Sequence, residues 1–238
     1  MSEEMVKFKS IGKTYVEPDG RVRRALWNVS FALEAGDFAF LTGRSGAGKS
    51  TLLKLLTLSE QPTSGELLVD GKVVCSEDDA KSRRRPMSKP AIQRYRRHLG
   101  TVFQDHQLLM DRSVYENVVL PLDITGNLNT MEKARRVKVA LEQVGLAGKE
   151  RQLPSTLSGG ERQRVGIARA IVHQPKMIIA DEPTGNLDPE LSLEIMQLFK
   201  RFSDEGVTVL VATHDMDSVA DLAPSSKTFT LQRGALVD

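Results

Sequence analysis

The sequence has a single cysteine, almost no net charge and no long apolar run, and each shortage excludes a class of protein. Cys75 has no second cysteine to pair with, so no internal disulfide can form and a reducing compartment is the natural location. Lysine and arginine number 33 against 31 aspartates and glutamates, a net charge of +2, so the chain lacks the broad positive field that attracts nucleic acid. We therefore expect no nucleic-acid partner.

Signals for secretion or membrane insertion are also missing. The start, MSEEMVKFKS, is acidic and lacks the apolar core of a secretory signal. The longest apolar runs, such as residues 207–212, fall far short of the roughly 20 residues that cross a bilayer. We expect a cytoplasmic chain, and this expectation leaves room for binding to a membrane protein.

What the sequence does contain is a set of short apolar runs that end in polar or glycine-rich turns: FAFLTG, MIIADE and VTVLVATHD. Continuous hydrophobicity of this kind is typical of strands buried on both faces, as in a parallel sheet covered by helices. Helices are predicted at residues 134–144, with Gly145 as a stop, and at 191–202. The first third has short strand-like pieces broken by proline and glycine, which predict an antiparallel sheet packed against the parallel core.

One segment is strongly biased in charge. Residues 81–97, KSRRRPMSKPAIQRYRR, contain eight basic residues and no acidic one. Contact with phosphate or an acidic partner is one interpretation. A solvated, flexible loop leading into a short basic helix is the favoured one.

The clearest chemical motif is GRSGAGKS at residues 43–50, which fits G-x-x-x-x-G-K-[ST] and lies between an apolar strand and an apolar helix. Glycines let successive N–H groups turn inward around phosphates, and the helix N-terminus favours negative charge. Lys49 is predicted to hold the β and γ phosphates, Ser50 to bind Mg²⁺ and Thr51 to reach the α-phosphate. A glycine-rich turn with a surface lysine is the alternative. The predicted ATP-binding residues of this loop are Gly43, Arg44, Ser45, Gly46, Ala47, Gly48, Lys49, Ser50 and Thr51.

Two acids end the run MIIADE. At the carboxyl edge of a parallel sheet, Asp181 would hold Mg²⁺ through water and Glu182 would orient or deprotonate an attacking water. Adjacent acids alone would more often be a solvated strand end. His214, after the next apolar run, could hydrogen-bond the γ-phosphate and the water, although a lone histidine at a strand end is otherwise usually structural.

A second glycine-rich helix start occurs at LSGGERQ. Ser158, Gly159 and Gly160 offer a hydroxyl, N–H groups and the positive end of a helix dipole to a phosphate. The chain has only one lysine-bearing loop and one Asp-Glu pair, so a second complete site in one subunit is not expected. Locally, Ser158 could equally be a simple N-cap.

Taken in order, GRSGAGKST, Gln104 in VFQDH, LSGGERQ, MIIADEPTGNLD and His214 in ATHD closely resemble the nucleotide-binding subunits of ABC-type ATPases. The resemblance extends from Tyr15 to the end of the chain. It implies an α/β fold, a P-loop NTPase of ABC type with a parallel-sheet core, an N-terminal antiparallel β subdomain and a helical subdomain. It also implies one ATP-binding domain over residues 1–238, with the helical lobe at about 106–172, and hydrolysis of ATP to ADP and phosphate.

The same resemblance implies roles for individual residues. Gln104 would reach Mg²⁺ and the attacking water and link the site to a membrane partner. Tyr15 would stack on adenine, although core packing is about as frequent for such an aromatic. Asp188 would face another subunit, or locally cap the helix that begins near Pro189. The signature residues would close over ATP held by a second subunit and so make an ATP-dependent homodimer: Ser158, Gly159, Gly160 and Glu161.

Within the ABC class, FQDHQLLMDRSVYENVVLPL and IADEPTGNLD look like the FtsE family of bacterial cell-division ATPases. This implies an integral-membrane FtsX-like partner, further cell-division proteins, and a place on the cytoplasmic face of the inner membrane at the division site. Closure on ATP would drive the partner to regulate cell-wall hydrolysis. Docking would use the Gln104 region and apolar residues after it, for which ordinary packing is the alternative: Leu108, Leu109, Met110 and Tyr115. The competing function is a lipoprotein-release or macrolide-export ATPase.

Overall fold

The computed structural model describes residues 4–76, 87–126, 128–185, 187–214 and 226–237. The chain divides into two compact units, Met1–Arg96 with Ala212–Asp238, and Arg97–Val211. Each unit is described by itself. In the described part of the chain, no helix has both the length and the apolar character needed to cross a bilayer.

The first unit begins with an antiparallel sheet, as predicted. Its strands are β1 (Glu4–Val16), β2 (Val22–Glu34), β4 (Ser64–Val69) and β5 (Lys72–Ser76), in the order β2-β1-β4-β5. Phe8 on β1 stacks on Phe31 of β2 with ring centroids 4.6 Å apart, and Phe31 lies 4.7 Å from Phe229. Aromatic pairs of this kind add to the burial that holds the sheet together.

The first unit also contains the strands next to the phosphate loop. β3 (Phe38–Thr42) pairs in parallel with β9 (Lys227–Gln232), and β9 pairs antiparallel with β10 (Ala235–Val237). All five residues of β3 are buried, which confirms the prediction of a strand covered on both faces. Helix α1 (Lys49–Leu56) follows and buries its four leucines.

The basic segment forms a short helix where the structure describes it. Helix α2 (Lys89–Arg96) buries Tyr95, whose hydroxyl donates to the Leu56 carbonyl at 3.0 Å. Arg96 donates to the carbonyls of Thr57 and Leu58 just after α1. The predicted basic helix is confirmed, and residues 81–86 of the segment lie outside the described residues.

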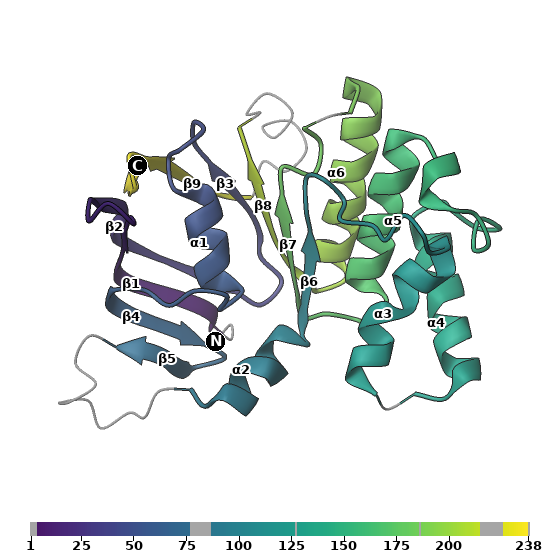
Figure 1. The fold of residues 1–238 in the computed structure, drawn as a ribbon, viewed down its shortest axis with the longest axis horizontal. Coiled ribbons are helices and arrows are strands. Elements are labelled where there is room, and N and C mark those ends of the chain that lie inside the picture. Colours follow the sequence, from purple (N-terminus) through teal and green to yellow (C-terminus); the bar gives the residue numbers. More distant parts are fainter. Residues whose placement is uncertain (1–3, 77–86, 127, 186, 215–225, 238) are drawn as a thin grey trace. The chain divides into compact units, whose positions relative to one another are not determined.

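The second unit combines strands and helices (Figure 1). Strand β6 (Leu99–Val102) pairs in parallel with β7 (Met177–Asp181). Strand β8 (Thr208–Thr213) is the next strand after β7 in the sheet order, and its first four residues belong to this unit. The helices of the second unit are α3 (Val114–Thr125), α4 (Thr130–Gln143), α5 (Gly159–Ile171) and α6 (Pro189–Asp204), with a short 3₁₀ turn at Pro154–Thr156. The helices predicted at 134–144 and 191–202 are therefore confirmed as parts of α4 and α6.

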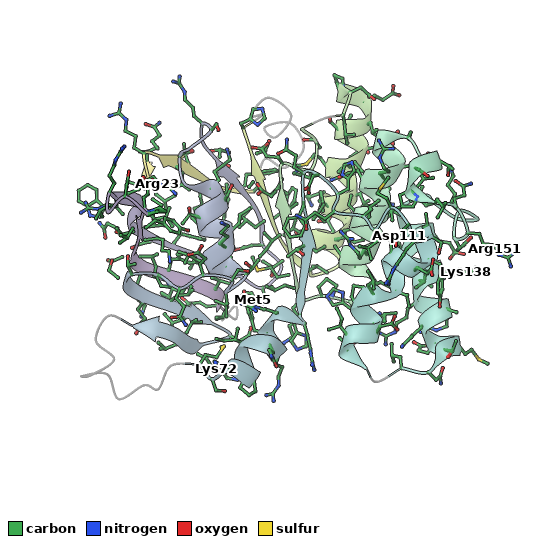
Figure 2. All side chains as sticks on the ribbon, viewed as in Figure 1. Met5, Arg23, Lys72, Asp111, Lys138 and Arg151 are labelled. Carbon is green, nitrogen blue, oxygen red and sulfur yellow. The ribbon has the colours of Figure 1, made fainter. Side chains whose placement is uncertain are left out.

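Helices α3, α4 and α5 pack on one another and fall within the range predicted for the helical lobe. Gly145, which follows the C-cap of α4, has φ 73°, so its lack of a side chain allows the chain to leave the helix. Exposed faces of this unit carry charge, for example at Lys138 and Arg151 (Figure 2). The assignment of residues 1–238 to a single domain stays a prediction.

Candidate nucleotide-binding and hydrolysis site

The loop between β3 and α1 has the backbone of a phosphate cradle. Gly43, Gly46 and Gly48 have φ of 144°, 78° and 115°, a region that residues with side chains rarely adopt. A Cβ on Gly48 would lie 2.8 Å from the Ala25 carbonyl oxygen, and one on Gly43 would lie 2.4 Å from the Leu231 carbonyl oxygen. Glycine is therefore required at both positions for conformation and for space.

Lys49 is the first residue of α1 and is only 8% exposed. Its Nζ donates to the Gly43 carbonyl at 2.6 Å, so the side chain reaches back to the start of the loop. Gly48, the N-cap of α1, provides no side-chain hydrogen bond to the first turn. Backbone N–H groups and a buried cation at a helix N-terminus fit an anion such as a phosphate chain. The alternative of a surface lysine does not fit, because the Lys49 side chain is buried.

Oxygen donors are available for Mg²⁺. Ser50 is exposed on the first turn of α1, and Asp181 ends β7. Among the described residues, no group of three or more His, Cys, Asp or Glu gathers in a way that could hold a metal ion. Hydroxyl and carboxylate oxygens are ligands that Mg²⁺ accepts. Ser50 belongs to the first unit and Asp181 to the second, so their joint binding of Mg²⁺, with Gln104 as a third predicted ligand, stays a prediction.

Glu182 lies directly after β7, in an unusual backbone conformation. Four of the five β7 residues are buried, and Glu182 itself is partly exposed with φ 47°. A left-handed conformation costs a non-glycine residue about 1–3 kcal/mol and persists where the surroundings impose it, which is most frequent at functional sites. The end of β7 therefore presents a carboxylate at a fixed, strained position.

The structure brings Gln104 and Glu182 together in the second unit. Gln104 follows β6, and β6 pairs with β7, which Glu182 follows. A Cβ on Gly185 would lie 3.3 Å from Gln104 Nε2 and 3.7 Å from Glu182 Cβ, so both side chains flank this glycine. Sequence reasoning did not single out Gly185, although a glycine three residues after the acid pair was a signal of close approach.

His214, Asp188 and Tyr15 also have described surroundings. His214 is exposed and follows β8, all six residues of which are buried. The Asp188 carboxylate caps α6 by accepting from Leu191 N at 2.9 Å, so the local interpretation of this acid holds and its contact with another subunit stays a prediction. Tyr15 is half-buried, with Lys13 Nζ 4.9 Å and the Arg23 guanidinium 5.1 Å from its ring centroid, and its adenine role also stays a prediction.

The signature segment forms a capped helix start. Ser158 Oγ accepts from Glu161 N at 3.2 Å, Glu161 accepts from Ser158 N at 2.8 Å, and Lys149 forms an ion pair with Glu161. A Cβ on Gly160 would lie 2.1 Å from Leu191 Cδ2, whereas one on Gly159 would meet nothing within 4 Å. Ser158 is exposed and is therefore available both as the N-cap and for a contact outside the subunit.

The capping box makes one prediction about pH. The hydrogen bond from Lys149, followed by that from the Ser158 backbone, lowers the pKa of Glu161 below its ordinary value. Because the folded-state pKa is lowered, this stabilisation is full above the ordinary pKa and is lost as the pH falls through the folded-state value. Replacing Glu161 with Gln should lower the free energy of unfolding at pH 7 by about 0.3–1 kcal/mol, the scale of a helix-terminus charge.

Thermal melts at pH 7 and at a pH below the ordinary pKa of glutamate measure this effect. Protonated Glu161 resembles Gln, so the difference between wild type and Glu161→Gln should shrink at the lower pH. Lys149→Met provides the matched variant, since it removes the same ion pair from the other side. An equal gap at both pH values would contradict the assignment.

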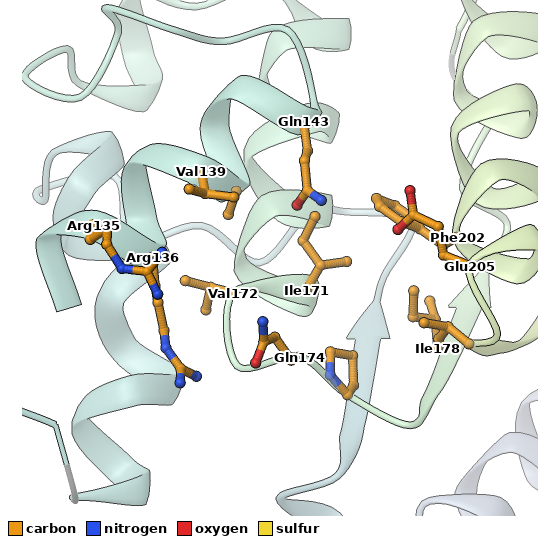
Figure 3. Close-up of a pocket in the computed structure, with 13 residues that line it drawn as sticks. Arg135, Arg136, Val139, Gln143, Ile171, Val172, Gln174, Ile178, Phe202 and Glu205 are labelled. Atoms are coloured by element: carbon orange, nitrogen blue, oxygen red, sulfur yellow. The ribbon is translucent and has the colours of Figure 1, made fainter. Parts of the chain in front are cut away.

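The second unit also contains a pocket. It has a volume of about 200 Å³ and is lined mainly from α4, the end of α5 and the end of α6, with Ile171, Ile178 and Phe202 among its apolar residues (Figure 3). Its thirteen lining residues include none of the predicted site residues. The phosphate loop and the acid pair, and not this pocket, carry the candidate chemistry.

Similarity to known proteins agrees with this geometry. The ABC transporter family model matches residues 26–185. The cell division ATP-binding protein FtsE of Escherichia coli K12 is 46% identical over 232 residues, 98% of this chain and 97% of the relative, and that of Mycobacterium tuberculosis is 43% identical over 211 residues, 89% and 86%. A solved dimeric structure of the ATP-binding cassette MJ0796 in a post-hydrolysis state, bound to ADP and Pi, is 33% identical with a TM-score of 0.83 and covers 98% of this chain and 97% of its own.

These relatives confirm the fold class and the resemblance to ABC-type ATPases of the FtsE kind. The fold of a solved ABC cassette extends over nearly the whole chain, and the matched family segment contains the phosphate loop, Gln104, the signature segment and the acid pair. The chain therefore belongs to the ABC transporter family and is an ATPase.

Proposed function

We propose that this chain is the ATP-hydrolysing subunit of a bacterial cell-division complex. It dimerises around ATP, and its closure drives an integral-membrane FtsX-like partner that regulates cell-wall hydrolysis at the inner membrane. The observation that carries the proposal is the similarity to FtsE proteins from distant bacteria over nearly the full chain, at 43–46% identity. The identity of the membrane partner and the regulation of cell-wall hydrolysis each need a separate test.

The chemistry follows from residues already described. Lys49 and the N–H groups at the start of α1 hold the phosphates, and Mg²⁺ would neutralise part of their charge. Water attacks the γ-phosphorus, its proton passes to the Glu182 carboxylate, and the bond from the γ-phosphorus to the bridging oxygen breaks, so ADP leaves. Gln104, held beside Glu182 over Gly185, orients the water.

The homodimer is supported by the signature segment. Ser158 and Gly159 are exposed or partly exposed at the N-terminus of α5, whose dipole favours a negative group. The chain has one lysine-bearing loop and one signature segment, and a head-to-tail pair of chains would combine them into two shared sites. Asp188, at the start of α6, would lie at the same junction.

A membrane partner is supported by apolar side chains after Gln104. Leu109 is 38% exposed and Met110 51% exposed. Buried Asn117 of α3 holds this loop through hydrogen bonds to the backbone of Leu109, Arg112 and Ser113. A loop with exposed apolar residues and a fixed backbone is suited to dock a short helix of a partner, since little ordering is needed on binding.

A photo-crosslinking residue at Met110 in living cells tests the partner. We expect it to capture an integral-membrane protein of the FtsX kind. The same residue at Met131 is the control, because this methionine is 83% exposed at the start of α4 and outside the proposed contact. Capture of a lipoprotein-release or export permease would replace the cell-division role with that function.

A further inference from the structure

The loop that follows Gln104 is anchored to α5, the helix that begins at the signature serine. Gly166 and Arg169 lie one turn apart on α5 and so share a face. A Cβ on Gly166 would lie 3.9 Å from the His106 carbonyl oxygen, so the helix backbone passes close to the loop. Arg169 lies in the last turn of the same helix, about three turns from Ser158.

Two residues of this loop have a strained backbone. His106 has φ 59° and Gln107 φ 45°, in the left-handed region that residues with side chains rarely adopt. They come two and three residues after Gln104. Such a conformation persists only where neighbouring groups impose it.

Arg169 supplies that restraint with both arms of its guanidinium. Its Nη2 donates to the His106 carbonyl and its Nη1 to the Gln107 carbonyl, each at 2.7 Å. Both bonds are short and charge-assisted, and the planar fork fixes the two carbonyls relative to each other. In the described part of the chain, no other arginine or lysine donates to these two carbonyls. The His106 and Gln107 N–H groups bond to the Phe103 and Asp105 carbonyls within the turn, so Arg169 is the link from these two residues to α5.

We propose that Arg169 is a positioning residue for Gln104. Its fork holds the two strained residues after the glutamine, which keeps the Gln104 side chain over Gly185 beside Glu182. Because Arg169 and Ser158 lie at opposite ends of α5, one helix connects the signature segment to the position of the glutamine. The inference rests on the role given to Gln104 in the proposed function.

Arg169→Met tests the inference, because it keeps the length of the side chain and removes the fork. We expect kcat for ATP hydrolysis to fall about 10- to 100-fold, the scale of an ångström-level misplacement. Nucleotide affinity should stay the same, and the Mg²⁺ concentration for half-maximal hydrolysis should rise. Arg164→Met is the matched control, because Arg164 lies on α5, donates to the Val144 carbonyl at 3.1 Å and pairs with Glu194 away from the loop. It should keep wild-type kcat.

The double variant Gln104→Ala with Arg169→Met separates positioning from general stability. If Arg169 acts through Gln104, adding Arg169→Met to Gln104→Ala should cause no further loss of kcat. Wild-type kcat in Arg169→Met, an equal loss in Arg164→Met, or losses that multiply in the double variant would overturn the proposal. If Arg169→Met does not fold, Arg169→Lys carries the same test, since lysine keeps the charge and lacks the planar fork.

Failure of this inference is distinguishable from failure of the proposed function. An impaired Gln104→Ala with an active Arg169→Met would remove only the role of Arg169. Wild-type hydrolysis by Gln104→Ala would instead remove the role of the glutamine itself.

Discussion

Replacing Glu182 with glutamine lowers ATP hydrolysis by about 10²-fold or more, the usual scale for loss of a general base, and leaves ATP bound. Glutamine has nearly the same shape and does not accept a proton from the attacking water. The phosphate loop is unchanged in this variant, so affinity for ATP should persist. Phosphate release and equilibrium ATP binding measure the two effects, and size-exclusion chromatography with ATP should show an accumulated dimer.

Two controls sharpen this result. Glu190→Gln makes the same change at an exposed glutamate in the first turn of α6, and it should hydrolyse ATP like the wild type. Lys49→Ala should lose ATP affinity itself, because a buried cation that contacts the loop is removed. Wild-type turnover in Glu182→Gln would remove this residue from the general-base role, and unchanged ATP affinity in Lys49→Ala would contradict the phosphate-loop assignment.

Local patterns in the sequence predict most of the elements that carry these residues. The run FAFLT becomes β3 and TLLKLL lies in α1, because continuous apolar runs and glycine spacing act over a few residues. The helix N-caps can also be predicted from the local sequence. Asp188 and Ser158 each accept from the backbone three residues on, as their position before a helix predicts.

Contacts between distant segments were not predictable in this way. Arg169 lies in VGIARAI, an otherwise apolar run of α5, and nothing in that run names the loop whose carbonyls it holds. The positive φ of Glu182 likewise cannot be predicted from the local sequence MIIADE, because φ depends on how the chain continues after β7. The roles of Gln104 and Tyr15 came from family resemblance. The structure adds a neighbour for each, Gly185 beside Gln104 and Arg23 over Tyr15.

Replacing Ser158 with arginine abolishes ATP hydrolysis and spares ATP binding to the monomer. The substitution places a bulky cation at the N-terminus of α5, against the positive end of the helix dipole and in the space predicted for the ATP of a second subunit. The phosphate loop of the same chain is unchanged, so nucleotide affinity should be that of the wild type. Phosphate release, ATP titration and the ATP-dependent dimer fraction are the measurements.

The chain contains a matched control for the stability that is lost when a helix N-cap is replaced. Ser113 caps α3 with the same box, accepting from Glu116 N at 3.2 Å, with the Glu116 side chain accepting from Ser113 N at 2.8 Å. Ser113→Arg should therefore lose a similar capping contribution, about 0.5–2 kcal/mol, and keep hydrolysing ATP. Equal loss of activity in both variants would attribute the effect of Ser158→Arg to helix stability.

Mixing two inactive variants tests whether the signature segment acts across subunits. A dimer of one Ser158→Arg chain and one Glu182→Gln chain contains one shared site with both an intact acid and an intact signature segment, because the two defects fall together in the other site. Phosphate release by the mixture should exceed the sum of the separate variants. If Ser158 instead served ATP bound to its own chain, every site would keep one defect and the mixture would gain nothing.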